Sequence, residues 1–135
     1  MSRGRTPKKG SDYYLPEETY RMVQHFCYAY YERKTEAMAL VGLKSPVIDD
    51  MPHGTGSSDP TARDGARLAE LERKNRIIEE AVKAVSPGGN WWLFKTVTDK
   101  RMGYRVLRDK YGCPYGPNQF WRMKRMVYWK VSKEI

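Results

Sequence analysis

Residues 117–133, near the end of the chain, carry side chains suited to reading nucleic-acid bases. At about 100° per residue, a helix there places its large apolar side chains on one side. These are Phe120, Met123, Val127 and Val131. The opposite side carries amides and guanidinium groups, namely Asn118, Gln119, Arg122 and Arg125. Arginine can bond two acceptors of guanine, and asparagine or glutamine can do the same for adenine. We therefore expect these four polar residues to read bases in duplex DNA.

Basic side chains around this helix are expected to contact phosphates, which position a protein on DNA and make its affinity fall with salt. They are Arg101, Arg105, Arg108, Lys110, Lys124 and Lys130, with Lys124 at the edge of the apolar stripe. Near the start of the chain, Arg3 and Arg5 suit a flexible arm that enters a minor groove. Two alternatives stay open. One is a solvated basic face, and the other is a helix on an anionic membrane surface, which Trp121 and Trp129 would suit.

The distribution of charge supports a polyanionic partner for the two ends of the chain. The 135 residues carry a formal net charge of +9 at pH 7. Residues 1–11 contribute +4, residues 12–89 contribute −3 and residues 90–135 contribute +8. Basic ends around a mildly acidic middle predict that the ends contact an anion while the middle has another role. The alternative is that the charge only maintains solubility.

Length and cysteine usage exclude several classes of protein. A chain of 135 residues is too short for an enzyme with separate cofactor and substrate domains. No apolar run approaches the roughly 18 to 20 residues that span a bilayer, and residues 1–11 lack the apolar segment of a secretion signal. Cys27 and Cys113 lie outside any CxxC pattern, and only His25 and His53 could join them as metal ligands. We expect a soluble intracellular protein without a disulfide scaffold or zinc finger.

Local signals predict an all-α fold, with an N-terminal antiparallel helical hairpin followed by a small C-terminal helix-turn-helix module. We divide the chain into a flexible basic arm (1–11), the hairpin (12–89) and the module (90–135). The first hairpin helix is expected to begin at Pro16 and Glu17 and to run to about Val41. Its apolar stripe comprises Tyr20, Val23, Cys27, Tyr30, Ala37 and Val41. Breakers predict a loop over 43–58, and Asp59 and Pro60 then open a second helix that runs to about Val85.

A heptad seam runs along the second hairpin helix. It comprises Leu68, Leu71, Asn75, Ile78, Val82 and Val85. Two interpretations stay open. The seam packs against the first helix within one chain, or it forms a coiled-coil homodimer through residues 68–85 in which Asn75 fixes the register.

The predicted C-terminal module contains three helices. Asn90 begins the first, over Trp91 to about Val97, and its large aromatic residues are expected to be buried anchors. These are Trp91, Trp92 and Phe94. The second covers Tyr104–Tyr111, ends at Gly112, and turns Val106, Leu107 and Tyr111 inward. After a turn over 112–116, Pro117 opens the last helix, which runs to about Lys133. A short helix, a turn and a longer helix with exposed polar residues is typical of a helix-turn-helix.

Motifs for catalysis are missing from the sequence. Asp49, Asp50 and His53 form the only cluster of acids and imidazole, and aspartates in a loop commonly bond backbone amides. The sequence contains no GxxxxGK[ST], GxSxG or HExxH motif. We therefore expect no enzymatic activity, no cofactor and no bound metal.

The order of these pieces resembles the small late-gene transcriptional regulators of phages and prophages of Gram-positive bacteria, of the RinA and ArpU kind. The resemblance covers about Tyr13 to Lys133. It rests on the tyrosine-rich first helix, the loop Ile48–Gly54, the helix start Ser58–Thr61 and the end Phe120–Arg125. The five-residue turn Gly112–Gly116 and the proline that opens the last helix depart from the pattern and affect the expected docking angle.

The resemblance implies a C-terminal helix-turn-helix similar to the promoter-reading region of sigma factors. Such a protein would act in the cytoplasm of the bacterial host, bind double-stranded DNA and contact host RNA polymerase. Asn118, Gln119, Arg122 and Arg125 occupy the matching recognition-helix positions. A protein-interaction adaptor, such as a packaging or polymerase-binding factor with only nonspecific nucleic-acid affinity, is the alternative.

Overall fold

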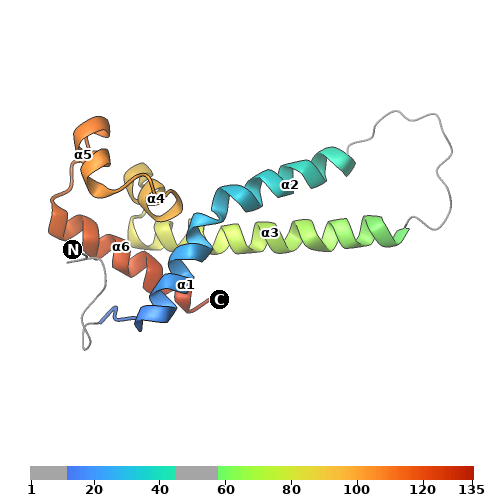
Figure 1. Cartoon of the computed structure of the whole chain (residues 1–135), viewed down its shortest axis with the longest axis horizontal. Coiled ribbons are helices and arrows are strands. Elements are labelled where there is room, and N and C mark those ends of the chain that lie inside the picture. Colours follow the sequence, from blue (N-terminus) through green and yellow to red (C-terminus); the bar gives the residue numbers. More distant parts are fainter. Residues whose placement is uncertain (1–11, 45–57) are drawn as a thin grey trace.

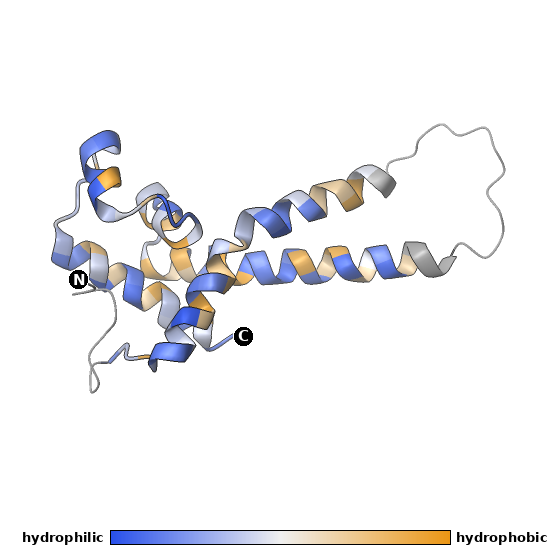
Figure 2. Ribbon diagram, viewed as in Figure 1, coloured by the Kyte–Doolittle hydropathy of each residue, from blue (hydrophilic) through white to orange (hydrophobic). Residues whose placement is uncertain are grey.

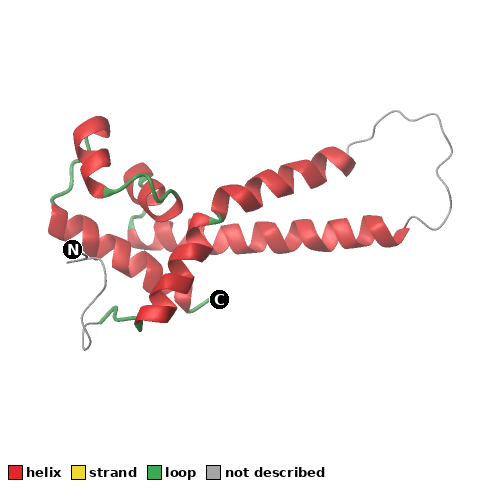
Figure 3. Cartoon of the chain, in the orientation of Figure 1, coloured by secondary structure: helices red, strands yellow, loops and turns green. Residues whose placement is uncertain are grey.

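The computed structural model describes residues 12–44 and 58–135, with side chains over 12–42 and 62–135. This part of the chain contains helices and no strand (Figure 3). The elements are α1 (Glu17–Tyr28), α2 (Tyr30–Lys44), α3 (Ser58–Val85), α4 (Trp91–Thr98), α5 (Tyr104–Tyr111) and α6 (Pro117–Ser132). The predicted all-α class is therefore confirmed, and the observed ends of α3 to α6 lie within a residue or two of the predicted ones.

The hairpin is an elongated arm. Helices α2 and α3 run antiparallel and project from the end of the molecule where α1, α4, α5 and α6 gather (Figure 1). Arg67 of α3 donates two hydrogen bonds to the Glu36 carboxylate of α2, at 2.7 and 2.9 Å. Nearer the gathered helices, the Tyr30 hydroxyl donates to the Glu79 carboxylate. Polar contacts therefore join α3 to the half of α2 that lies nearer the gathered helices.

The prediction of one continuous helix from Pro16 to Val41 is wrong. The helix breaks at Ala29, whose φ of −82° and ψ of 4° form a turn between α1 and α2. Helix α1 leaves the line of the hairpin and crosses the gathered helices, while α2 continues along α3 (Figure 1). The predicted stripe divides accordingly, because Val23 and Cys27 are fully buried whereas Val41 is 49 % exposed. Packing against two different partners redirects a helix that its periodicity alone would continue.

One hydrophobic core joins the two halves of the chain. Its buried members come from the segment before α1, from α1 to α4 and from α6, and Figure 2 shows the matching apolar bands. They are Leu15, Tyr20, Val23, Cys27, Tyr30, Ile78, Ala81, Val82, Leu93, Val97, Val127, Tyr128 and Val131. The division predicted at residue 89 is therefore not a boundary between separate cores, because the C-terminal half of α6 packs among α1, α3 and α4.

The heptad seam of α3 is covered within the chain. Leu71, Ile78 and Val82 are at most 3 % exposed, whereas Leu68 and Val85 at the ends of the seam are half-buried. The Asn75 amide donates to the Tyr30 carbonyl oxygen at 3.1 Å. This arrangement agrees with the interpretation of packing within one chain. A homodimer through residues 68–85 would have to form without the three buried side chains at the centre of the seam.

Helix α4 begins as predicted, because the Asn90 side-chain oxygen accepts the Leu93 amide at 3.0 Å. The expectation that Trp91 is a buried anchor is wrong, since this side chain is 45 % exposed and lies against the 46 % exposed ring of Tyr111. Tyr111 was expected to turn inward, and its exposure makes this prediction wrong as well. The buried positions near them are taken by Leu93 and Leu107, both with no exposed surface.

Candidate nucleic-acid interface

Helices α5 and α6 are joined by a turn whose conformation is fixed at both ends. Gly112 ends α5 with φ 66° and ψ 34°, the left-handed conformation that glycine adopts without steric cost. The next amide, of Cys113, donates to the Leu107 carbonyl oxygen at 3.0 Å. Later in the turn, the Tyr115 carbonyl oxygen accepts the Tyr104 hydroxyl at 2.6 Å. The predicted glycine stop is therefore confirmed.

A second hydrophobic cluster holds the first turns of α6. It contains buried Leu107, Cys113 and Phe120, with partly buried Trp92, Met102, Tyr104, Tyr115 and Trp121 around them. The indole of Trp92 in α4 donates to the Tyr111 carbonyl oxygen at 3.1 Å, which ties α4 to the end of α5. Helices α4, α5 and α6 therefore form a three-helix unit, and the start of α6 lies at the end of the molecule opposite the tip of the hairpin arm (Figure 1).

The four predicted base-reading residues occupy the outer side of α6. Asn118, Gln119 and Arg122 are exposed, and Arg125 is half-buried. Opposite them, Phe120, Val127 and Val131 have no exposed surface, which confirms the predicted apolar face. Tyr128 is also fully buried, and it packs edge-on against Tyr20 of α1 at a ring-centroid distance of 5.3 Å. The amides and guanidinium groups at the start of α6 thus stand on a rigidly packed helix.

Most of the predicted phosphate contacts lie on the surface. Arg101, Arg105, Arg108 and Lys110 are exposed, and Lys130 is half-buried. Arg101 lies 3.3 Å from the Asp99 carboxylate, and Arg108 lies 2.9 Å from that of Asp109. These hydrogen bonds raise the pKa of the Arg101 and Arg108 guanidinium groups. A phosphate at either arginine would share the guanidinium with a carboxylate of the same chain, whereas Lys110 forms no such ion pair among the described residues.

Lys124 lies in the buried stripe of α6, at whose edge the sequence placed it, and this burial removes it from the open surface where a phosphate contact was expected. This lysine is only 6 % exposed, and its ammonium lies 4.8 Å from the ring centroid of Trp121 and 5.8 Å from that of Tyr128. Helix α1 covers it, because Tyr20 and Gln24 of α1 lie beside it in one pocket. A phosphate on the open face of α6 therefore does not meet Lys124.

The sequence did not indicate that Lys100 lines this pocket, nor that Lys124 lies in a pocket at all. Lys100 precedes Arg101 in the short segment between α4 and α5, and only the path of that segment places Lys100 in the pocket beside Lys124. The Lys100-Arg101 pair was the available signal. This pair indicates positive charge at this point of the chain but does not indicate where either side chain lies in the fold.

Several predicted elements lie outside the described residues. These are Arg3 and Arg5 in the arm, Asp49, Asp50 and His53 in the loop, and the side chains of Asp59 and Pro60 at the start of α3. Across residues 12–44 and 58–135, no three His, Cys, Asp or Glu side chains gather as a set that could hold a metal ion. None of the helices in these ranges combines the length and apolar character that crossing a bilayer requires.

Comparisons of the chain with protein-family models, with curated proteins and with solved structures found no match.

Proposed function

We propose that this protein is a phage-type transcriptional regulator that binds duplex DNA through α6. The observation that carries the proposal is the row of amides and guanidinium groups on the outer side of α6, exposed at Asn118, Gln119 and Arg122. The other side of the helix buries Phe120, Val127 and Val131 completely. Asn118, Gln119, Arg122 and Arg125 are the proposed base-reading residues. A rigid helix that presents such groups at its first turns suits the major groove, which admits an α-helix and displays a distinct pattern for each base pair.

The charge around α6 supports the same proposal. Residues 117–132 include no Asp or Glu, and residues 90–135 carry a net charge of +8. Exposed Arg105 and Lys110 on α5 would meet the phosphates beside the groove occupied by α6. Each phosphate so neutralised releases condensed counterions, so the affinity for any duplex should fall with salt. The base contacts would then add a preference for one sequence over another.

A contact with host RNA polymerase forms the second part of the proposal. The hairpin arm would stay accessible when the basic module binds DNA. The arm is mildly acidic, because residues 12–89 carry a net charge of −3. The arm projects away from α6 (Figure 1). A protein bound at a promoter through α6 would therefore have the arm available for a partner.

Replacement of Arg122 tests the base-reading role. Arg122→Ala should reduce the ratio of affinities for operator and scrambled duplex by about 5- to 150-fold, since a bidentate contact is worth about 1–3 kcal/mol of discrimination. Arg122→Lys keeps the charge but loses the planar fork, so its discrimination should also fall while its salt dependence stays that of the wild type. Fluorescence anisotropy with both duplexes gives these ratios, and Lys83→Ala on the exposed side of α3 is the control.

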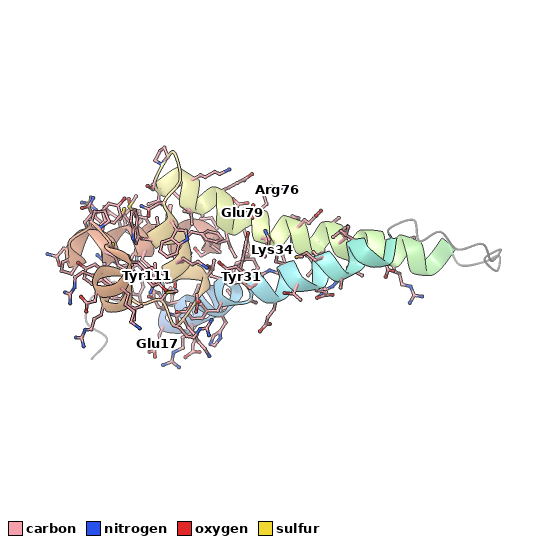
Figure 4. All side chains as sticks on the ribbon, turned by 90° about the horizontal axis from the view of Figure 1, so that it is seen from above. Glu17, Tyr31, Lys34, Arg76, Glu79 and Tyr111 are labelled. Carbon is pink, nitrogen blue, oxygen red and sulfur yellow. The ribbon has the colours of Figure 1, made fainter. Side chains whose placement is uncertain are left out.

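The hairpin arm also gives an adaptor role specific support. Met38 is 67 % exposed and Val41 is 49 % exposed, and both line an open groove of about 600 Å³ between α2 and α3. Charged side chains border the same groove, with Lys34 on α2 and Arg76 and Glu79 on α3 (Figure 4).

Alanine at both Arg122 and Arg125 separates the adaptor from the regulator. An adaptor should keep its protein partner and change only in salt sensitivity, whereas a regulator should lose its discrimination between duplexes.

A further inference from the structure

A polar pocket of about 580 Å³ opens beside α6, between α1, the segment that precedes α5, and the first turn of α5. Three cationic side chains line it, from three different elements: Lys100, Arg105 and Lys124. Tyr28 and Gln24 of α1 and Trp121 of α6 supply polar and aromatic walls. Of the described residues that line this pocket, none is acidic. All the charged side chains that line the pocket are therefore positive.

Lys124 is the innermost of the three cations. Only 6 % of the residue is exposed, whereas Lys100 and Arg105 are exposed at the rim. Removing an ammonium from water is costly, and the rings of Trp121 at 4.8 Å and Tyr128 at 5.8 Å offset part of that cost. An anion that enters the pocket would add a Coulombic attraction in surroundings of lower dielectric than water. A buried lysine at the inner end of a cationic pocket thus favours a negatively charged ligand.

The start of α5 adds backbone donors to the same pocket. Gly103 precedes α5 and makes no side-chain hydrogen bond to the first amides of the helix. Gly103, Tyr104 and Arg105 all line the pocket. The first amides of a helix carry partial positive charge and commonly bind phosphate oxygens. Together with the buried ammonium, they offer both charge and hydrogen bonds to a tetrahedral oxyanion.

We propose that this pocket binds a phosphate group. Trp121 and Lys124 precede Arg122 and Arg125 directly in α6, so the pocket flanks the proposed base-reading row. One source of the phosphate is the backbone of a DNA duplex bound at α6, and this part of the inference rests on the proposed function. The other source is a free phosphate or a phosphomonoester. In either case Lys124 acts inside the pocket and not on the open face of the helix.

The indole N–H signal of Trp121 is the reporter of occupancy. It is recorded in proton–nitrogen NMR spectra of the full chain and assigned with Trp121→Phe. Inorganic phosphate is titrated at constant ionic strength, with chloride as the reference anion, and a short duplex is titrated separately. The variants are Lys124→Met, which keeps the length of the side chain and removes its charge, and Arg105→Gln at the exposed rim. Lys83→Gln, remote on α3, is the control of equal charge change.

A free phosphate is supported as the source if inorganic phosphate shifts the Trp121 signal saturably in the wild type and in Lys83→Gln. Lys124→Met and Arg105→Gln should then bind phosphate at least tenfold more weakly. A short duplex that shifts the signal in the wild type, and whose binding has a logarithmic salt slope smaller by about one unit in Lys124→Met, supports a backbone phosphate, because a phosphate on the open face of α6 does not reach Lys124. Equal responses of the wild type and both variants to phosphate and to duplex would overturn the inference.

The two proposals fail separately. If the wild type prefers its operator while the pocket variants behave like the control, the pocket inference is wrong and the regulator stands. If phosphate binds saturably but the chain has no preference among duplexes, the pocket stands and the sequence-specific regulator does not. Because Arg105 is exposed, its variant keeps the test valid even if replacement of buried Lys124 disturbs folding.

Discussion

Replacement of Asn75 by leucine distinguishes the two roles that a polar residue can have in the seam of α3. In a coiled-coil dimer, a buried asparagine fixes the register at a cost in stability, so leucine would stabilise the assembly. In the structure, Asn75 is 8 % exposed and bonds to groups of its own chain. Its oxygen accepts the Arg33 guanidinium at 2.7 Å, and its amide donates to the Tyr30 carbonyl oxygen at 3.1 Å. We therefore expect Asn75→Leu to destabilise the protein.

The expected loss follows from the two hydrogen bonds. A bond to a charged group contributes about 1.5–3 kcal/mol, and a neutral bond contributes about 1 kcal/mol. Arg33 keeps its bond to the Phe26 carbonyl oxygen at 2.6 Å, and the added apolar surface of leucine returns about 1 kcal/mol. The net decrease in the free energy of unfolding is then about 2 kcal/mol. For a chain of this length, that corresponds to a fall in Tm of about 8 °C.

Urea denaturation followed by circular dichroism measures this change, and repetition at two protein concentrations separated by a hundredfold detects any dimer. Glu72→Leu, on the exposed side of α3, is the matched control and should leave the midpoint unchanged within error. An Asn75→Leu protein as stable as the wild type or more stable, with a midpoint that rises with concentration, would refute the packing of α2 on α3 described here.

Three further predictions concern the turn, the start of α4 and the buried thiol. Gly112→Ala should lower the free energy of unfolding by about 1–2 kcal/mol, because φ at this position is 66°. Gly116→Ala, at φ −72°, should cost less, because it loses only the preference for glycine over alanine at the N-cap of α6. Thermal denaturation of both variants is the check, and equal losses would contradict the prediction. Asn90→Ala removes the acceptor of the Leu93 amide and should cost about 1–2 kcal/mol in urea denaturation, so an unchanged midpoint would show that this cap is dispensable. Burial raises the pKa of the Cys27 thiol from an ordinary value of 9.0 to about 12. The unfolded chain therefore loses this proton at a lower pH than the folded chain, so the free energy of unfolding should fall as pH rises from about 9 to 12. Cys27→Ala should flatten that decrease in urea midpoints measured from pH 8 to 11, and an unchanged slope would exclude the thiol as its source.

The elements that sequence reasoning located well are those with strong local signals. Asn90 before an apolar run, Gly112 after one, and Pro117 at the opening of α6 each fix a helix end through the chemistry of their own backbone or side chain. The buried face of α6 was also predicted, because Phe120 and Val127 repeat at a helical period. Signals of this kind act within a few residues and need no knowledge of the rest of the fold.

The break at Ala29 was not predictable in this way. No glycine or proline marks it, and the apolar stripe continues through it, since Cys27 and Tyr30 are both buried. What bends the chain is tertiary: α1 packs on α6 and α4, while α2 packs on α3. Arg33 then stabilises the break by donating to the Phe26 carbonyl oxygen across it. A side chain from one helix thus caps the end of the preceding one, which periodicity cannot reveal.

The candidate site was predicted in its chemistry more than in its placement. The outward amides and guanidinium groups follow from the helical period of α6, and Asn118 and Arg122 are exposed as expected. Lys124 was expected to contact a phosphate on the surface because the position of α1 was unknown, and α1 covers it. The exposure of Trp91 likewise depends on how Tyr111 closes over one side of the indole and leaves the other open.

Whether α6 reads a DNA sequence can be measured with the wild-type chain alone. Its binding to duplex fragments from its own genomic neighbourhood is compared with binding to a scrambled duplex across a salt series, by fluorescence anisotropy. We expect one fragment to bind at least a hundredfold more tightly than the scrambled duplex and to keep this preference at raised salt, because base contacts do not depend on counterion release. Equal affinity for every duplex, falling steeply with salt, would contradict it.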